Sequence, residues 1–243
     1  MSRQLSSELL KLRTTRTVPA LLLAAAALTL LGTCVEGLSP ATAELASRET
    51  QRTMFSAGVT AVLFATLAGL VTVTGEFRYG TIRPTLLVQP RRRVVLAAKL
   101  AAAALVGVLF AVACVAVAFA AGRAILAVRG AGVSLAGGDV LPLTLGVAVA
   151  AVMGALIGVA VGALIRNQVG AIVAVAAYAF AVDAVLFAAA PSVGRYLPGK
   201  AGDGLAGRPV EHLLGPWPGA AVLALWTLAF VIAATVRTDR SDV

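Results

Sequence analysis

The stretch that most resembles a catalytic motif is GRYLPGKA, residues 194–201. Its first seven positions match the phosphate-binding pattern G-x-x-x-x-G-K-[ST], in which backbone amides and the lysine hold nucleotide phosphates and the final hydroxyl binds magnesium. Ala201 replaces that hydroxyl, no strand is expected before the stretch, and no apolar helix follows it directly. We therefore interpret the match as accidental and expect no nucleotide site there.

The chain has too few histidines for a site that requires two or more of them. His212 is the only histidine, so a zinc site with two histidines or a relay of histidines cannot form. We expect no catalytic residue and no metal site, and we interpret His212 as a solvated loop residue. The net charge of +9 comes without the interleaved aromatic residues of a nucleic-acid-binding groove, so no nucleic acid partner is expected.

Asp183, within AFAVDAVLF, is the acidic residue that lies clearly inside an apolar segment. An aspartate at the centre of a membrane helix costs about 2.5 to 3.5 kcal/mol on insertion scales, so such a residue usually faces a cavity, a partner or the protein interior. Two roles stay open. Asp183 lines a transport route, or it forms hydrogen bonds with groups of a neighbouring outer loop.

The composition of the whole chain is that of a membrane protein. Of its 243 residues 60% are hydrophobic and only 13% are charged, and the mean hydropathy is +0.95, more than one soluble core needs. A transmembrane helix needs about 20 apolar residues, and the apolar runs are continuous, unlike the short alternating segments of a membrane barrel. We predict an all-α membrane protein with a single transmembrane domain over residues 1–243. Its six spans are expected at about 17–35, 53–74, 98–121, 141–165, 168–190 and 217–236.

The distribution of lysine and arginine predicts the orientation. Six spans put both termini on one side of the membrane, and an excess of these residues marks the cytoplasmic side. The segments on the side of the termini hold thirteen: Arg3, Lys11, Arg13, Arg16, Arg78, Arg83, Arg91, Arg92, Arg93, Lys99, Arg166, Arg237 and Arg240. Those on the other side hold seven: Arg48, Arg52, Arg123, Arg129, Arg195, Lys200 and Arg208. We therefore expect both termini in the cytoplasm.

The N-terminal segment resembles a signal peptide, because a basic start and an apolar run precede the small residues of ATAELA. However, the run from Thr17 to Val35 is longer than the apolar part of such peptides, and cleavage would leave five spans. In the intact chain Leu5, Leu9 and Leu12 recur at helical spacing, which favours an amphipathic helix in the membrane interface. A frayed basic tail that only sets the topology is the alternative.

Two further features concern the later spans. Gly154, Gly158 and Gly162 form a small-xxx-small face in the fourth span, which permits close contact with a helix of the same chain or, alternatively, across a dimer. The long outer connection before the last span is rich in proline and precedes Trp217. We expect a re-entrant segment that dips into the outer interface without crossing it, with a plain connector as the alternative.

The connection between the second and third spans, residues 75–93, reads GEFRYGTIRPTLLVQPRRR. Orientation and contact with anionic lipid headgroups explain its final arginines, which are Arg91, Arg92 and Arg93. Neither explanation requires Glu76, Tyr79 or the residues 81–87. An ordinary loop that sets the topology thus explains this part of the connection less well than it explains the arginines.

The connection resembles the cytoplasmic loop of type-2 permease subunits of ATP-binding cassette (ABC) exporters, which often read G-E-[FY]-R-x-G-T-I, then T-L, P-x-R and A-K. The residues that carry the resemblance are Gly75, Glu76, Phe77, Arg78, Tyr79, Gly80, Thr81, Ile82, Leu86, Leu87, Pro90, Arg92, Ala98 and Lys99. The loop motif is the specific part. ELLKLRTTR before the first span, the six spans and the charged ending RTDRSDV extend the resemblance over the whole chain.

The resemblance implies a multi-pass permease of the bacterial cytoplasmic membrane that has no ATPase of its own. It would pair with a second permease subunit, identical or not, and with two cytoplasmic nucleotide-binding subunits that hold ATP and magnesium, while this chain binds no cofactor. The helix after the Gly-Glu boundary would be a coupling helix, which docks on the ATPase and passes its closure to the spans as a rigid-body movement. The coupling residues implied are Gly75, Glu76, Phe77, Arg78, Tyr79, Gly80, Thr81, Ile82, Arg83, Leu86 and Leu87.

Few polar residues lie inside the spans, so we expect the exporter to move an amphipathic or hydrophobic compound such as a drug, an antibiotic or a lipid. The alternative is a secondary transporter or a channel-like protein that needs no ATPase. Such a protein would be expected to carry more acidic residues in its spans or an inverted repeat. The sequence shows one such acid, Asp183, and no inverted repeat.

Overall fold

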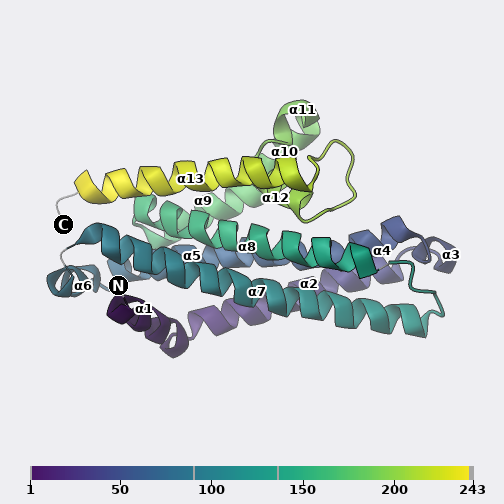
Figure 1. The fold of residues 1–243 in the computed structure, drawn as a ribbon, viewed down its shortest axis with the longest axis horizontal. Helices are drawn as coiled ribbons and strands as arrows, with labels where there is room; N and C mark the ends of the chain where they lie inside the picture. Colours follow the sequence, from purple (N-terminus) through teal and green to yellow (C-terminus); the bar gives the residue numbers. More distant parts are fainter. Residues whose placement is uncertain (1, 90, 136, 241–243) are drawn as a thin grey trace.

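The computed structural model describes residues 2–89, 91–135 and 137–240, and every regular element in these ranges is helical. In chain order the elements are α1 (Ser2–Thr14), α2 (Thr17–Leu38), α3 (Thr42–Leu45), α4 (Arg48–Phe55), η1 (Ser56–Val59), α5 (Thr60–Arg78), α6 (Ile82–Val88), α7 (Arg92–Val128), α8 (Gly137–Ile165), α9 (Gln168–Ala177), η2 (Tyr178–Val182), α10 (Asp183–Ala189), α11 (Pro191–Gly194), α12 (Pro198–Leu205) and α13 (Pro216–Arg240). Together they form an elongated bundle of roughly parallel and antiparallel helices (Figure 1).

Six helical segments are long and apolar enough to cross a membrane: Thr17–Leu38, Arg48–Arg78, Arg92–Val128, Gly137–Ile165, Gln168–Ala189 and Pro216–Arg240. The prediction of six apolar helices of membrane-spanning length is thereby confirmed. Several helices are longer than predicted, the third above all. Charged residues end an apolar window, but a helix can continue past the hydrocarbon because water and headgroups solvate its polar side chains.

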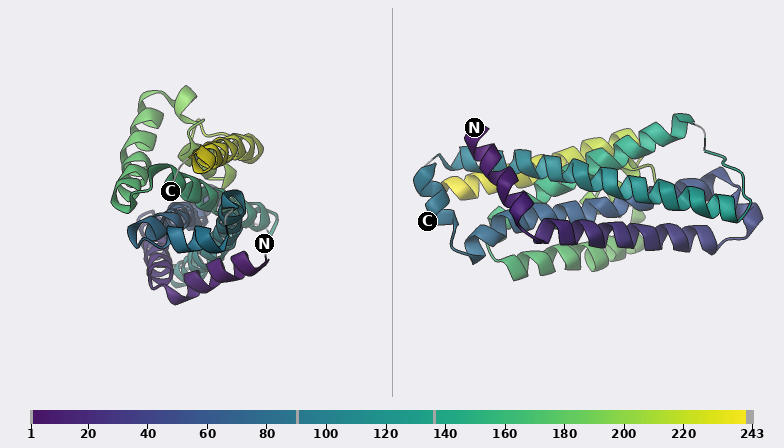
Figure 2. Two further views of the ribbon diagram at one scale, coloured as in Figure 1. Left: turned by 90° about the vertical axis from the view of Figure 1, so that its left-hand side faces the viewer. Right: turned by 90° about the horizontal axis from the view of Figure 1, so that it is seen from below.

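The two ends of the bundle differ in what they carry. The start of α1, the short helix α6 and the end of α13 lie at one end, on the left of Figure 1, which we call the proximal end. The helices α3 and α4 and the end of α7 lie at the other, which we call the distal end. The helix α1 crosses the bundle obliquely at the proximal end before the chain turns into α2 (Figure 2).

The centre of the bundle is the contact between α5 and α8. A Cβ atom on Gly158 would collide with the carbonyl oxygen of Thr66, and one on Gly154 would lie 2.8 Å from the hydroxyl of the same threonine. From the other side, a Cβ atom on Gly69 would collide with the carbonyl oxygen of Ala155. Small residues thus let the two backbones touch. The glycine face of the fourth span packs within this chain.

The fifth span and the segment after it lie at the edge of the bundle. Ala171 and Asp183 are the buried residues of α9 and α10, and a π-helical turn, η2, joins these two helices. The short helix α12 folds back beside α8 and α13, where a Cβ atom on Gly219 would lie 2.7 Å from the carbonyl oxygen of Ala201. The entry of this segment into the membrane interface stays a prediction.

Candidate functional site

The end of α5 is built by the first residues of the motif. Gly80 adopts a φ of +68°, which glycine reaches without steric cost. This lets the amide of Thr81 donate to the carbonyl of Glu76 at 2.9 Å and the amide of Gly80 to the carbonyl of Phe77 at 3.4 Å. The pattern is a Schellman motif, which ends a helix and turns the chain sharply. It places α6, the next helix in the chain after α5, at the proximal end.

A cluster of four charged side chains joins α1, α5 and α7 at the proximal end. The ammonium of Lys99 lies 2.9 Å from Oε2 of Glu8 and 2.7 Å from Oε1 of Glu76. The ammonium of Lys11 lies 2.9 Å from Oε1 of Glu8 and 2.6 Å from Oε1 of Glu76. We call these residues the charge cluster. It fixes the N-terminal helix to the end of the second span and the start of the third.

The charge cluster is largely shielded from solvent. Glu8 and Lys99 are each 3% exposed and Glu76 is 6% exposed, whereas the side chain of Lys11 is 40% exposed. Such charges are tolerated because the two ammonium groups balance the two carboxylates at close range. Glu76 therefore does not face solvent as a docking residue would. Its contacts make it a positioning residue for the turn that follows it.

Lys11 shows how the carboxylates act on their neighbours. Burial alone would lower the pKa of Lys11, but hydrogen bonds and charge attraction from Glu76 and then Glu8 outweigh it, so its pKa is raised above the usual 10.5. A raised pKa of a lysine means that its contribution to stability is fully present below the unfolded-state pKa and is lost as pH rises through the folded-state pKa. Lys11 is thus charged and stabilising at neutral pH.

The short connection between α8 and α9 also contacts the motif. Arg166 adopts a φ of +58°, and its guanidinium carbon lies 5.4 Å from the ring centre of Phe77. Arg78 donates to Oε1 of Gln168 at 3.2 Å. These contacts tie the end of the second span to the start of the fifth, so a displacement of the turn would reach the peripheral span as well.

The start of α7 is clamped to the end of α13. Arg93 lies 2.7 Å from Oδ2 of Asp239, and Arg92 donates to the carbonyl of Thr238 at 3.2 Å. These two arginines, predicted for lipid headgroups and topology, thus also have protein contacts. Arg91 is exposed, and its contact with lipid headgroups stays a prediction.

The helix α6 has one side toward the bundle and one side toward solvent. Ile82 and Phe77 line a small cavity of about 50 Å³ next to Arg166. On the outside, Leu87 is 83% exposed and Tyr79 is 74% exposed. The side chains of Arg83 and Leu86 lie outside the described residues. We call residues 75–87 the predicted coupling segment. Its exposed face consists of Tyr79, Thr81 and Leu87, since Thr81 is exposed as well.

A second group of charges lies around Asp183 and α12. The carboxylate of Asp183 accepts a hydrogen bond from the hydroxyl of Tyr178 at 3.0 Å and lies 3.3 Å from the ammonium of Lys200. Asp183 is 5% exposed, and a Cβ atom on Gly199 would lie 2.7 Å from its Oδ1. Lys200 and Gly199 belong to the segment that follows the fifth span, so these contacts agree with the second of the two roles left open. A place on the transport route stays a prediction.

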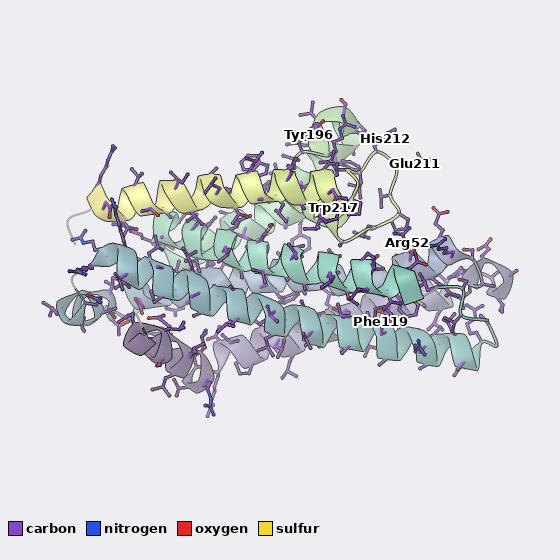
Figure 3. All side chains as sticks on the ribbon, viewed as in Figure 1. Arg52, Phe119, Tyr196, Glu211, His212 and Trp217 are labelled. Atoms are coloured by element: carbon purple, nitrogen blue, oxygen red, sulfur yellow. The ribbon has the colours of Figure 1, made fainter. Side chains whose placement is uncertain are left out.

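The same contacts account for the stretch that matched a phosphate-binding pattern. Lys200, the lysine of that pattern, lies between the carboxylates of Asp183 and Asp203, 3.5 Å from the latter. It is therefore neutralised by protein carboxylates. Figure 3 shows His212 on the loop between α12 and α13, where it is exposed. The described residues hold no group of three or more His, Cys, Asp or Glu that could bind a metal ion.

The comparison with known families agrees with this arrangement. A family model described as ABC-2 family transporter protein matches residues 4–182, most of the chain. The chain belongs to the ABC-2 transporter family. No curated protein matches it. The predicted resemblance is thereby confirmed, and the match includes most of α1, the charge cluster and the residues of the predicted coupling segment.

Some residues of the proximal site escaped sequence reasoning. The sequence alone assigns no role to Glu8, and Lys99 belongs there only to the motif and to the charge count. A usable signal was present, because Glu8 and Lys11 are spaced three residues apart and Lys99 lies beside an apolar run that can hardly leave it unpaired. No signal in the sequence paired Arg166 with Phe77, since the contact depends on how α8 meets α5.

In α10, we expect Asp183→Asn to loosen the contact of this helix with α12. The substitution removes the ion pair with Lys200 but keeps an oxygen that can accept from Tyr178. Hydrogen exchange of residues 198–205 should accelerate severalfold, while the exposed Glu211→Gln should leave it unchanged. Unchanged exchange in Asp183→Asn would contradict this positioning role, and a loss of transport together with unchanged exchange would favour the transport-route role.

Proposed function

We propose that the chain is the permease subunit of an ABC exporter and that its proximal end lies in the cytoplasm. The observation that carries the proposal is the coupling segment: α6 lies at the proximal end with Tyr79 and Leu87 exposed, while Glu76 just before it is held to two other helices. Family membership supports this assignment. The excess of thirteen lysines and arginines over seven supports the orientation.

In this proposal ATP and magnesium are held by two cytoplasmic nucleotide-binding subunits, and this chain performs no catalysis. An ATPase docked on the exposed face of the coupling segment would pull on a rigid unit. The Schellman turn, the charge cluster and the contact between Arg166 and Phe77 connect α6 to α1, α5, α7 and the start of α9. Closure of the ATPases would therefore move several spans together.

A second permease subunit would complete the pathway. The spans α2 and α9–α10 bury few of their residues within this chain, so they border lipid or the second subunit. The expected substrate is an amphipathic or hydrophobic compound, because the main core of the bundle consists largely of Ala and Val.

The proposal is tested by reconstitution of the chain with a cassette ATPase encoded beside it. Proteoliposomes that contain both proteins should accumulate a fluorescent amphipathic substrate when ATP and magnesium are added on the ATPase side. Vesicles with the chain alone should not do so under an imposed proton or sodium gradient. Transport by the chain alone in response to a gradient would contradict the proposal and support a secondary transporter.

A further inference from the structure

A groove opens on the surface of the bundle where α1 meets α2 and α7. It has a volume of about 480 Å³, and its walls include Leu12 of α1, Leu22 of α2 and Leu105 and Leu109 of α7. The last two side chains are 52% and 48% exposed within the chain. Apart from Arg13, every residue that lines the groove is apolar. Such a groove suits a hydrocarbon chain rather than a polar solute.

The charge at the rim of the groove is positive. Arg13 belongs to the lining and is exposed, and Arg16 follows it at the junction of α1 and α2. No acidic residue lines the groove, and in the ranges that the structure describes no ion pair to either arginine is found. The nearby Lys11 is held by Glu8 and Glu76. The rim can therefore attract a phosphate, whereas Lys11 is committed to the charge cluster.

The groove lies at the depth at which a phospholipid changes from headgroup to chain. The first span begins at Thr17, so Arg13 and Arg16 lie at the membrane surface, where basic side chains meet headgroups. Leu22 lies about 8 Å further along α2 than Thr17, at about 1.5 Å per residue. The order from rim to floor is thus basic and then apolar, which matches one lipid molecule.

We propose that this groove binds one anionic phospholipid, with its phosphate at Arg13 and an acyl chain along Leu22, Leu105 and Leu109. The lipid lies against α1, whose residues Glu8 and Lys11 reach Glu76 at the base of the coupling segment. It therefore holds α1 in the orientation that the charge cluster requires. The site is independent of the ATPase and of the transported compound.

The test is native mass spectrometry of the purified chain with added phosphatidylglycerol or with phosphatidylcholine of the same acyl chains. We expect tighter retention of phosphatidylglycerol and a loss of about fivefold in its affinity in Arg13→Gln, the effect of one basic residue at a membrane surface. Leu105→Trp should fill the groove and lower the retention of both lipids. Soluble glycerophosphoglycerol should not compete, because it has a phosphate but no acyl chain.

Arg123→Gln is the matched control, since it removes an exposed arginine from the distal part of α7. The effects of Arg13→Gln and Leu105→Trp should be less than additive, because both act on one site, whereas Arg123→Gln and Leu105→Trp should be additive. Unchanged retention in Arg13→Gln, or full additivity with Leu105→Trp, would show annular lipid only and overturn the proposal. Competition by glycerophosphoglycerol would overturn the assignment of a lipid in favour of a phosphate site.

Discussion

Lys99→Met is expected to destabilise the permease by about 3 to 5 kcal/mol, the loss typical of a buried ion pair that is left with one partner. Lys99 is 3% exposed and lies within 2.9 Å of carboxylate oxygens from both Glu8 and Glu76. Without it two buried carboxylates share only Lys11. The measurement is the free energy of unfolding in mixed micelles, followed by intrinsic tryptophan fluorescence.

A double-mutant cycle separates the charge cluster from simple packing. Glu8→Gln combined with Lys99→Met leaves the pair of Glu76 and Lys11, whose ammonium lies 2.6 Å from the carboxylate. The double variant should be destabilised by clearly less than the sum of the single variants. Arg123→Met on the exposed side of α7 should change stability by less than about 0.5 kcal/mol. Additive losses, or a Lys99→Met variant as stable as Arg123→Met, would contradict the cluster.

Leu87→Asp is expected to weaken association with the ATPase by about 30-fold or more and to reduce ATP-driven transport, while the permease itself still folds. Leu87 is 83% exposed on α6, so an aspartate there costs little in the free chain. In a complex the same position would lie in the interface core, where loss of an apolar anchor and burial of a charge weaken binding by about 2 kcal/mol or more, roughly 30-fold. The measurement is the fraction of ATPase that copurifies with the permease in detergent.

Val128→Asp is the matched control for Leu87→Asp. Val128 is 88% exposed and ends α7 at the distal end. Its substitution therefore also replaces an exposed apolar side chain with aspartate, but far from the coupling segment. This variant should copurify with the ATPase as the unmodified chain does. If equal amounts of ATPase copurified with Leu87→Asp and with Val128→Asp, the coupling segment would not lie in the interface with the ATPase.

The spans could be predicted from the sequence because continuous apolar runs have one stable solution in a membrane. The turn at Gly80 could be suspected as well, since a glycine between Arg78 and Thr81 is typical of a helix end. The partners of Glu76 could not be predicted, because they come from α1 and α7, and Lys11 of α1 lies 65 residues from Glu76 in the sequence. Such pairings depend on how helices cross, and helix crossing is set by many small contacts that no single residue reveals.

The packing of the segment before α13 could not be predicted for the same reason. Its prolines predicted irregular structure, but the packing of α12 against α8 and α13 depends on glycines in three elements that the sequence does not connect, among them Gly146 and Gly219. Conversely, the glycines of the fourth span were recognised as a contact face. Only the structure shows that α5 of the same chain occupies this face.

The central claim is that the exposed face of the coupling segment binds the ATPase. Photo-crosslinking in intact membranes tests it most directly. A photoreactive residue is introduced at Leu87 or, as a control, at Val128, and the products are identified by mass spectrometry. We predict that position 87 forms a covalent adduct with a cassette ATPase and that position 128 forms none. An active transporter in which position 87 yields no ATPase adduct, or in which both positions yield it equally, would contradict the account.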